Sequence, residues 1–266
     1  MPHDPIIEPA ALPSLGSFRL LDVREPAAFE AGHPAKAVRV PIEVWEAAAK
    51  AGETSFENVA YWQHAIADLG VDSQRPTVVY DDGRMTEAAR VWFILQYFGA
   101  EAFILNGGWA AIQGHQNLLA TAEGYGIPAA AFRARPGSGP VGLVDRQTLK
   151  AELGANVRVF DARTAGEFAG EDLRRNARGG HLPGARLLPH SSLLDHGRLK
   201  SAGDLLDLLV GAGFQPGDHI VTHCDGGGRA ALAAAATVRA GYDNVRAYYL
   251  SFADWAKDES CSIVRD

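Results

Sequence analysis

Cysteines and long hydrophobic runs are scarce in this sequence of 266 residues. Only two cysteines occur, Cys224 and Cys261, and these are too few for the disulfide framework of a small secreted domain. No apolar run approaches the ~20 residues that a membrane-spanning helix requires. The N-terminal residues 1–5 lack the basic and apolar regions of a secretory signal, so we expect a cytoplasmic protein.

Positive charge is also in deficit, because 25 lysines and arginines face 32 aspartates and glutamates and leave a formal net charge of -7. This balance gives no electrostatic basis for binding nucleic acid or an anionic membrane. The two cysteines lack the paired His/Cys spacing of a metal site. We therefore expect no metal, no cofactor, no nucleic acid partner and no membrane partner. An anionic substrate would have to be attracted by local charges.

The sequence contains one structural plan twice. In each copy, an apolar segment ending in Asp-x-Arg precedes a Gly-His pair, a β-branched strand, a long helix and an aromatic closing segment. These parts are residues 18–24, 32–33, 77–80, 87–98 and 106–109 in the first copy, and residues 157–163, 180–181, 219–223, 229–240 and 251–255 in the second. Strands that alternate with helices predict an α/β fold with two tandem domains, each a central parallel sheet with helices on both faces.

A stretch rich in proline, glycine and alanine separates the two copies and is typical of an inter-domain linker. We place the first domain at residues 1–125, the linker at 126–142 and the second domain at 143–266. The first copy has Asp81 directly after its β-branched strand, where the second copy has Cys224. The two copies therefore share a plan but differ in chemistry at this position.

The turn after the second β-branched strand is the most informative segment. It consists of Cys224, Asp225, Gly226, Gly227, Gly228 and Arg229. Ligands of parallel α/β sheets bind at the carboxyl ends of the strands, and consecutive glycines let backbone N–H groups turn inward around an anion. The positive end of the following helix points to the same place. We expect this environment to favour the thiolate of Cys224 and to make it a nucleophile that forms a covalent intermediate.

Two plainer interpretations compete with this one. A cysteine at the end of a strand is often a small buried hydrophobic residue. A glycine-rich turn between a strand and a helix often binds a nucleotide phosphate, but no Gly-Lys-Ser/Thr follows here. The combination of a cysteine and three glycines in one short turn favours the nucleophile.

Taken together, these motifs resemble those of the two-domain rhodaneses, a family that includes thiosulfate and 3-mercaptopyruvate sulfurtransferases. The resemblance rests on residues 22–24, 32–34 and 105–109 in the first copy, and on residues 161–163, 180–185, 224–229 and 251–255 in the second. It implies that Cys224 takes a sulfane sulfur from a small donor, forms a persulfide and releases sulfite or pyruvate. A thiophilic acceptor, cyanide or a thiol, then removes the sulfur. It also implies a catalytically silent first domain, because the carboxylate of Asp81 cannot form a persulfide.

Three positions depart from the family pattern and bear on the choice of donor. Mercaptopyruvate enzymes typically have a serine where this chain has Gly226, and often an arginine where it has Glu167. Thiosulfate rhodaneses usually have a cationic residue where it has Asp225, whose carboxylate would repel a dianion. We rank thiosulfate or a related donor first and 3-mercaptopyruvate second.

Three arginines could supply positive charge to the site. Arg178 and Arg163 are candidate substrate-binding residues. The alternative for Arg178 is a place in a solvated surface loop, and the alternative for Arg163 is a structural network with Asp161 that holds the loops of the domain. Arg229 either faces the substrate or braces the loop through an ion pair. The charged segment 171–178 lengthens the second copy and could bring cations to the site, although such runs are more often solvated surface loops.

Two further functions are open. The glycines of the loop leave its mouth accessible to a bulky thiol, so the protein could be a persulfide carrier that docks on a protein acceptor. A phosphatase is the weaker alternative, because rhodanese-fold tyrosine phosphatases have a longer Cys-x5-Arg loop. Here only four residues separate Cys224 from Arg229, and the shorter loop crowds a phosphate.

Overall fold

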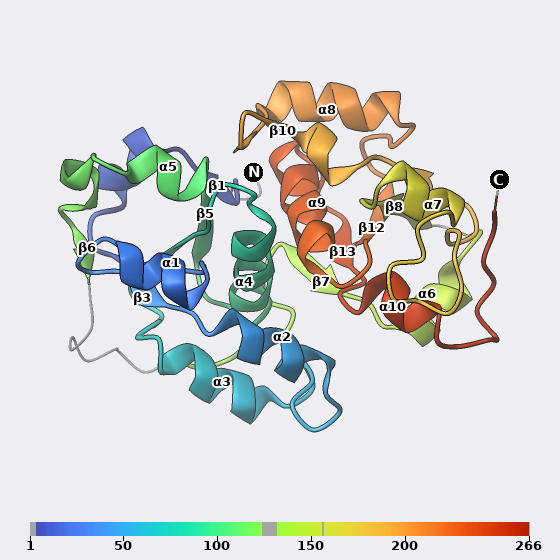
Figure 1. Cartoon of the computed structure of the whole chain (residues 1–266), viewed down its shortest axis with the longest axis horizontal. Coiled ribbons are helices and arrows are strands. Elements are labelled where there is room, and N and C mark those ends of the chain that lie inside the picture. Colours follow the sequence, from blue (N-terminus) through green and yellow to red (C-terminus); the bar gives the residue numbers. More distant parts are fainter. Residues whose placement is uncertain (1–3, 124–131, 156, 266) are drawn as a thin grey trace. The chain divides into compact units, whose positions relative to one another are not determined.

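The computed structural model describes residues 4–123, 132–155 and 157–265 (Figure 1). They form two compact units, which we call the N-terminal unit (residues 4–123, 132–139 and 196–198) and the C-terminal unit (residues 140–155, 157–195 and 199–265). Residues 126–131 of the predicted linker lie outside the described residues, and the predicted domain boundaries stay a prediction. Among the described residues, no helix is long and apolar enough to span a membrane.

The N-terminal unit is built on a parallel sheet. Its strands, in spatial order, are β1 (Ile6–Ile7), β5 (Ala102–Leu105), β4 (Thr77–Tyr80), β2 (Phe18–Asp22) and β3 (Val38–Arg39), and β6 (Ala122–Glu123) also pairs with β2. The helices are α1 (Pro26–Ala31), α2 (Ile42–Lys50), α3 (Val59–Ala67), α4 (Thr86–Tyr97) and α5 (Gly108–Ile112), with 3-10 turns η1 (Pro9–Leu15) and η2 (Gln116–Leu119).

The C-terminal unit repeats this arrangement. Its parallel sheet has the order β7 (Val141–Leu143), β13 (Val245–Ala247), β12 (His219–His223), β8 (Val157–Asp161) and β9 (Arg186–Leu187). The helices are α6 (Arg146–Glu152), α7 (Ala165–Ala169), α8 (Ala202–Gly211), α9 (Gly228–Arg239) and α10 (Ser251–Trp255). A 3-10 turn η3 (His190–Leu193) precedes a separate two-stranded sheet of β10 (Leu194–Asp195) and β11 (Arg198–Leu199).

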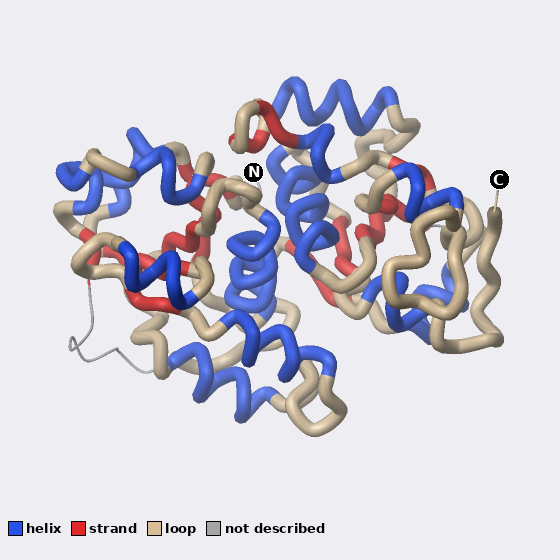
Figure 2. Tube along the Cα trace, in the orientation of Figure 1, coloured by secondary structure: helices blue, strands red, loops and turns tan. Residues whose placement is uncertain are grey.

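Within each unit the strands lie between helices (Figure 2), so the predicted α/β fold with parallel sheets is confirmed. The central strands β4 and β12 are buried along almost their whole length, which is why their sequences are continuously apolar or β-branched rather than alternating. Helix α9 is alanine-rich because nearly all of it is buried, against the strands β12 and β13 on one side and α8 on the other. Its short side chains let the backbone approach the sheet closely.

A buried ion pair fixes the loop that follows the first long strand of each unit. The carboxylate of Asp161 accepts hydrogen bonds from the backbone and the guanidinium of Arg163, and the guanidinium also donates to the carbonyl of Gly180 at 2.8 Å. Asp22 and Arg24 form the same arrangement in the N-terminal unit. Both pairs are almost fully shielded from solvent. The repeated Asp-x-Arg motif therefore holds the same loop in both units.

Replacing Asp161 with asparagine should destabilise the protein by about 3 to 5 kcal/mol, because the guanidinium of Arg163 stays buried without its counter-charge. Denaturant unfolding followed by circular dichroism measures the change. As a control, Lys50→Ala removes the exposed ion pair with Glu46 and should cost less than about 1 kcal/mol. Equal losses in the two variants would contradict this ranking.

Candidate active site

Cys224 follows β12 directly, at the carboxyl end of the most central strand of the C-terminal sheet. Its side chain is buried, with the whole residue only 2% exposed. The chain then turns through Gly227, whose φ of 104° lies in the region that favours glycine, and enters α9 at Gly228. The predicted strand–turn–helix context of the cysteine is therefore present.

A backbone amide and a side-chain hydroxyl contact the sulfur of Cys224. The backbone N–H of Gly227 donates to Sγ at 3.1 Å, and the hydroxyl of Ser251 lies 3.8 Å from Sγ. The Ser251 oxygen also accepts the backbone N–H of Cys224 at 3.1 Å. Ser251 was not among the residues that the sequence singled out. The available signal was its place in the closing segment, where the first copy has glycine.

The closing segment of each copy holds the loop in place. In the C-terminal unit, Phe252 N–H donates to the carbonyl of Cys224 at 3.0 Å and Ala253 N–H donates to that of Asp225 at 3.1 Å. In the N-terminal unit, Trp109 N–H donates to the carbonyl of Asp81 at 2.8 Å. The repeated aromatic segments therefore anchor the loop that carries the residue at the nucleophile position.

Arg229 forms a bidentate ion pair with Glu167, with distances of 2.6 and 2.8 Å. Burial opposes the charge of both groups, but their hydrogen bonds lower the pKa of Glu167 to about 2 and, with the nearby sulfur of Cys224, raise the pKa of Arg229. The Nε atom of Arg174 lies 3.8 Å from the same carboxylate. Glu167, which stands where an arginine is often found, thus holds a cation that comes from the loop instead.

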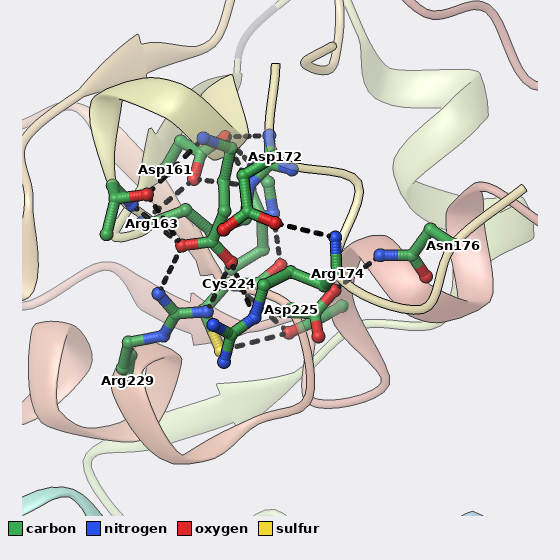
Figure 3. Close-up of polar contacts among 12 residues, drawn as sticks. Asp161, Arg163, Asp172, Arg174, Asn176, Cys224, Asp225 and Arg229 are labelled. Atoms are coloured by element: carbon green, nitrogen blue, oxygen red, sulfur yellow. Dashed lines mark hydrogen bonds and ion pairs between the residues drawn. The ribbon is translucent and has the colours of Figure 1, made fainter. Parts of the chain in front are cut away.

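Asp225 is oriented by the segment that lengthens the second copy. The side-chain amide of Asn176 donates to its carboxylate at 2.7 Å. Figure 3 shows Arg229 and Asn176 on opposite sides of the loop that carries Cys224 and Asp225. Asp172 accepts the backbone N–H of Arg174 at 2.9 Å in the same segment. Segment 171–178 is therefore attached to the loop and is not merely a solvated turn.

The two arginines that were predicted from the sequence to bind substrate have other partners. The guanidinium of Arg178 donates to four backbone carbonyls of the C-terminal segment, those of Trp255, Ala256, Asp258 and Cys261. Arg163 is bound to Asp161 and lies over the ring of Phe252 at 4.0 Å. These contacts favour the structural alternative for Arg163, and they give Arg178 a structural role in place of both the predicted substrate binding and the solvated loop.

Two histidines near the site are also in contact with neighbouring residues of the C-terminal unit. His181 stacks on Phe168 and its Nδ1 lies 3.1 Å from the carbonyl of that residue, so its ring is in contact with the loop backbone. His223 is fully buried and its Nε2 lies 3.3 Å from the carboxylate of Asp161. His223 is therefore a packing residue of the core.

Asp81 uses its own loop as a binding site for its carboxylate. The carboxylate accepts backbone N–H groups of Gly83, Met85 and Ala88 at 2.9 to 3.1 Å. Burial raises its pKa even though these hydrogen bonds oppose the shift. The loop of the N-terminal unit therefore already holds an acceptor, supplied by the residue at the nucleophile position.

Cys261 lies in the hydrophobic core of the C-terminal unit beside Trp255. Burial and the carboxylate of Asp258 raise the pKa of its thiol. A buried thiol of this kind is a poor nucleophile. Its burial and raised pKa give Cys261 no part in the chemistry of Cys224.

The Glu167–Arg229 pair should make stability depend on pH in the acid range. The pKa of Glu167 is depressed from 4.5 to about 2, so the stabilisation is complete above pH 4.5 and is lost as the pH falls toward 2. Over this range, the difference in unfolding free energy between the wild type and Glu167→Gln should shrink by about 3 kcal/mol. Urea unfolding at each pH measures it. Glu43→Gln, which removes an exposed pair with Arg39, is the control and should show a much smaller change. A difference that is constant with pH would contradict the assignment.

Proteins from three bacteria are similar in sequence to this chain. It is 30% identical to the 3-mercaptopyruvate sulfurtransferase of Escherichia coli K12 over 193 residues, which cover 72% of this chain and 68% of that protein. It is 30% identical to the putative thiosulfate sulfurtransferase SseB of Mycobacterium tuberculosis H37Rv over 267 residues (92% and 90%). It is 28% identical to the thiosulfate sulfurtransferase of Pseudomonas aeruginosa PAO1 over 265 residues (94% and 93%).

Solved structures have the same fold. The 3-mercaptopyruvate sulfurtransferase SseA of Escherichia coli matches with a TM-score of 0.71 and 25% identity, over 93% of this chain and 98% of that one. Tum1 of Saccharomyces cerevisiae matches with a TM-score of 0.79 and 21% identity, over 100% of both chains.

The model of the rhodanese-like domain matches the sequence twice, at residues 10–115 and 145–258. The two matches include Asp81 and Cys224, the residues at the ends of the two equivalent strands. This chain therefore belongs to the rhodanese family and is a sulfurtransferase with two tandem rhodanese-like domains.

Proposed function

We propose that this protein moves a sulfane sulfur from thiosulfate, or a related small donor, to a thiophilic acceptor through a persulfide on Cys224. The observation that carries the proposal is the donation of the Gly227 N–H to the sulfur at the carboxyl end of the central strand. A backbone N–H aimed at a sulfur stabilises negative charge on it. The relatives that are named thiosulfate and 3-mercaptopyruvate sulfurtransferases support the same chemistry.

The reaction has two displacements, both at sulfur. The thiolate of Cys224 attacks the outer sulfur of thiosulfate, a new S–S bond forms, and the bond to the sulfite group breaks with its electron pair leaving on sulfite. Cyanide or a thiolate then attacks the outer sulfur of the persulfide, and the electron pair of the broken S–S bond returns to Cys224. The Gly227 N–H can stabilise the charge on Cys224 before the first step and after the second.

The N-terminal unit takes no part as a nucleophile in this proposal. The carboxylate of Asp81 cannot form a persulfide, and it accepts three backbone N–H groups of its own loop. We place the sulfur chemistry in the C-terminal unit alone.

Two carboxylates near Cys224 would repel an anionic donor such as thiosulfate if they had no partners. Glu167 and Asp225 are both carboxylates, but Glu167 is paired with Arg229 and Asp225 is bound by Asn176. Gly226 and Glu167 replace residues typical of mercaptopyruvate enzymes, so 3-mercaptopyruvate is the second candidate donor. A protein thiol is a further candidate acceptor, and the cysteine usage favours a cytoplasmic location.

Incubation with thiosulfate should add one sulfur atom to Cys224, and mixing with cyanide should yield thiocyanate. Cys224→Ser should lose both, while Cys261→Ser should keep both because its buried thiol lies in the core. Intact mass spectrometry and a thiocyanate assay measure the two outcomes, with 3-mercaptopyruvate tested in parallel. The absence of sulfur on Cys224 and of product from either donor would refute the proposed function.

Replacing Asp225 with asparagine should raise kcat/KM for thiosulfate about threefold at low ionic strength, because the change removes a negative charge next to the nucleophile. Asparagine keeps the shape of the side chain and can still pair with Asn176. The gain should shrink at physiological salt, where the Debye length is ≈ 8 Å. Asp207→Asn removes an exposed carboxylate from α8 and serves as the control for net charge. Equal gains in both variants would rule out a local effect of Asp225.

A further inference from the structure

Ser251 has a backbone conformation that is unusual for a residue with a side chain. Its φ is 62°, in the left-handed region, and its exposure is 0%. A non-glycine residue pays strain for this conformation, and a buried one keeps it only when the surroundings enforce it. Such positions are found preferentially at functional sites, which makes the identity of this residue informative.

The first copy of the plan shows which residue this conformation ordinarily takes. Gly108 has a φ of 55°, and the residue after it donates its N–H to the carbonyl of Asp81, as the residue after Ser251 does to that of Cys224. Gly108 and Ser251 are therefore equivalent. A Cβ at Gly108 would lie 2.6 Å from the carbonyl oxygen of Asp81, so that copy excludes any side chain. The C-terminal unit has made room for a side chain at the same point.

The hydroxyl of Ser251 has three neighbours, and two of them belong to the nucleophile. Its oxygen accepts the N–H of Cys224 at 3.1 Å and lies 3.8 Å from Sγ, while the hydroxyl donates to the carbonyl of Tyr248 at 2.8 Å. A rotation about the Cβ–Oγ bond redirects the proton from the carbonyl toward the sulfur. Neither glycine nor alanine can make any of these contacts.

We propose that Ser251 is a positioning residue for sulfur transfer, which fixes the backbone of Cys224 and supplies a hydrogen-bond donor to its sulfur in addition to the N–H of Gly227. The proposal rests on the proposed persulfide function of the same cysteine. When the acceptor attacks the outer sulfur, the S–S bond breaks and its electron pair returns to Sγ of Cys224. The hydroxyl of Ser251 and the N–H of Gly227 then donate to this leaving thiolate, and no proton leaves either donor.

The test compares Ser251→Gly with the wild type. Glycine fits the left-handed conformation, as Gly108 shows, so the variant should fold with a Tm within about 5 °C of the wild type. Discharge of a preloaded persulfide by cyanide should slow about tenfold, because the leaving thiolate loses a donor. Alkylation of Cys224 by iodoacetamide should slow about threefold, measured on the peptide that carries Cys224. A purely structural serine predicts neither loss.

Two controls make the comparison specific. His196 is exposed, has a positive φ of 46° and belongs to neither the Cys224 loop nor the closing segment, so His196→Gly relieves the same kind of strain and should leave both rates unchanged. Ser251→Ala removes the hydroxyl but keeps Cβ, and it should slow both reactions as the glycine variant does. Wild-type rates in folded Ser251→Gly would overturn the proposal, and so would a failure of this variant to fold, because it would contradict the equivalence with Gly108.

The two proposals can fail separately. If the wild type takes no sulfur from thiosulfate or from 3-mercaptopyruvate, the proposed function fails. The alkylation rates still compare the reactivity of Cys224 with and without the hydroxyl. Slower alkylation in both Ser251 variants then supports the contact with the sulfur, whereas unchanged alkylation overturns it.

Discussion

Backbone N–H groups that turn inward after a central strand need an acceptor, and the two copies of the plan satisfy this need in different ways. In the N-terminal unit, the carboxylate of Asp81 accepts three of them. In the C-terminal unit, the N–H of Gly227 points at the sulfur of Cys224. The carboxylate of Asp81 is bound by its own loop and cannot form a persulfide. A sulfur bound by such N–H groups can carry negative charge and can act as a nucleophile and as a leaving group. One loop geometry therefore gives one structural copy and one copy suited to group transfer.

The charged side chains around Cys224 are bound to neighbouring side chains. Arg229 enters from the loop and is held by Glu167, so its cation is neutralised close to the sulfur. Asp225 is held by the amide of Asn176, which orients the carboxylate without cancelling its charge. A site with this balance attracts a dianion less strongly than a ring of free cations would. The use of thiosulfate by this site therefore depends on whether the Arg229–Glu167 pair and the Asn176–Asp225 hydrogen bond rearrange when the dianion binds.

The closing segments of the two copies differ at one position beside the residue that follows the central strand. Both copies use the N–H of an aromatic residue to hold the carbonyl of the nucleophile position. The residue before it is Gly108 in one copy and Ser251 in the other, with nearly the same backbone conformation. The C-terminal unit accepts the strain of a left-handed serine and gains a hydroxyl beside the sulfur.

The α/β class, the repeated order of strands and helices, and the position of Cys224 at a strand end could be predicted from the amino-acid pattern alone. These features follow from hydrophobic periodicity, glycine positions and repeated motifs, all of which are local along the chain. Three contacts of the site could be seen only in the folded chain: the pair of Arg229 with Glu167, the hydrogen bond of Asn176 to Asp225 and the contact of Ser251 with Cys224. The partners in these contacts are 62, 49 and 27 residues apart in sequence. Their meeting depends on how the parallel strands align and how the loops at one sheet edge pack, which no local pattern records.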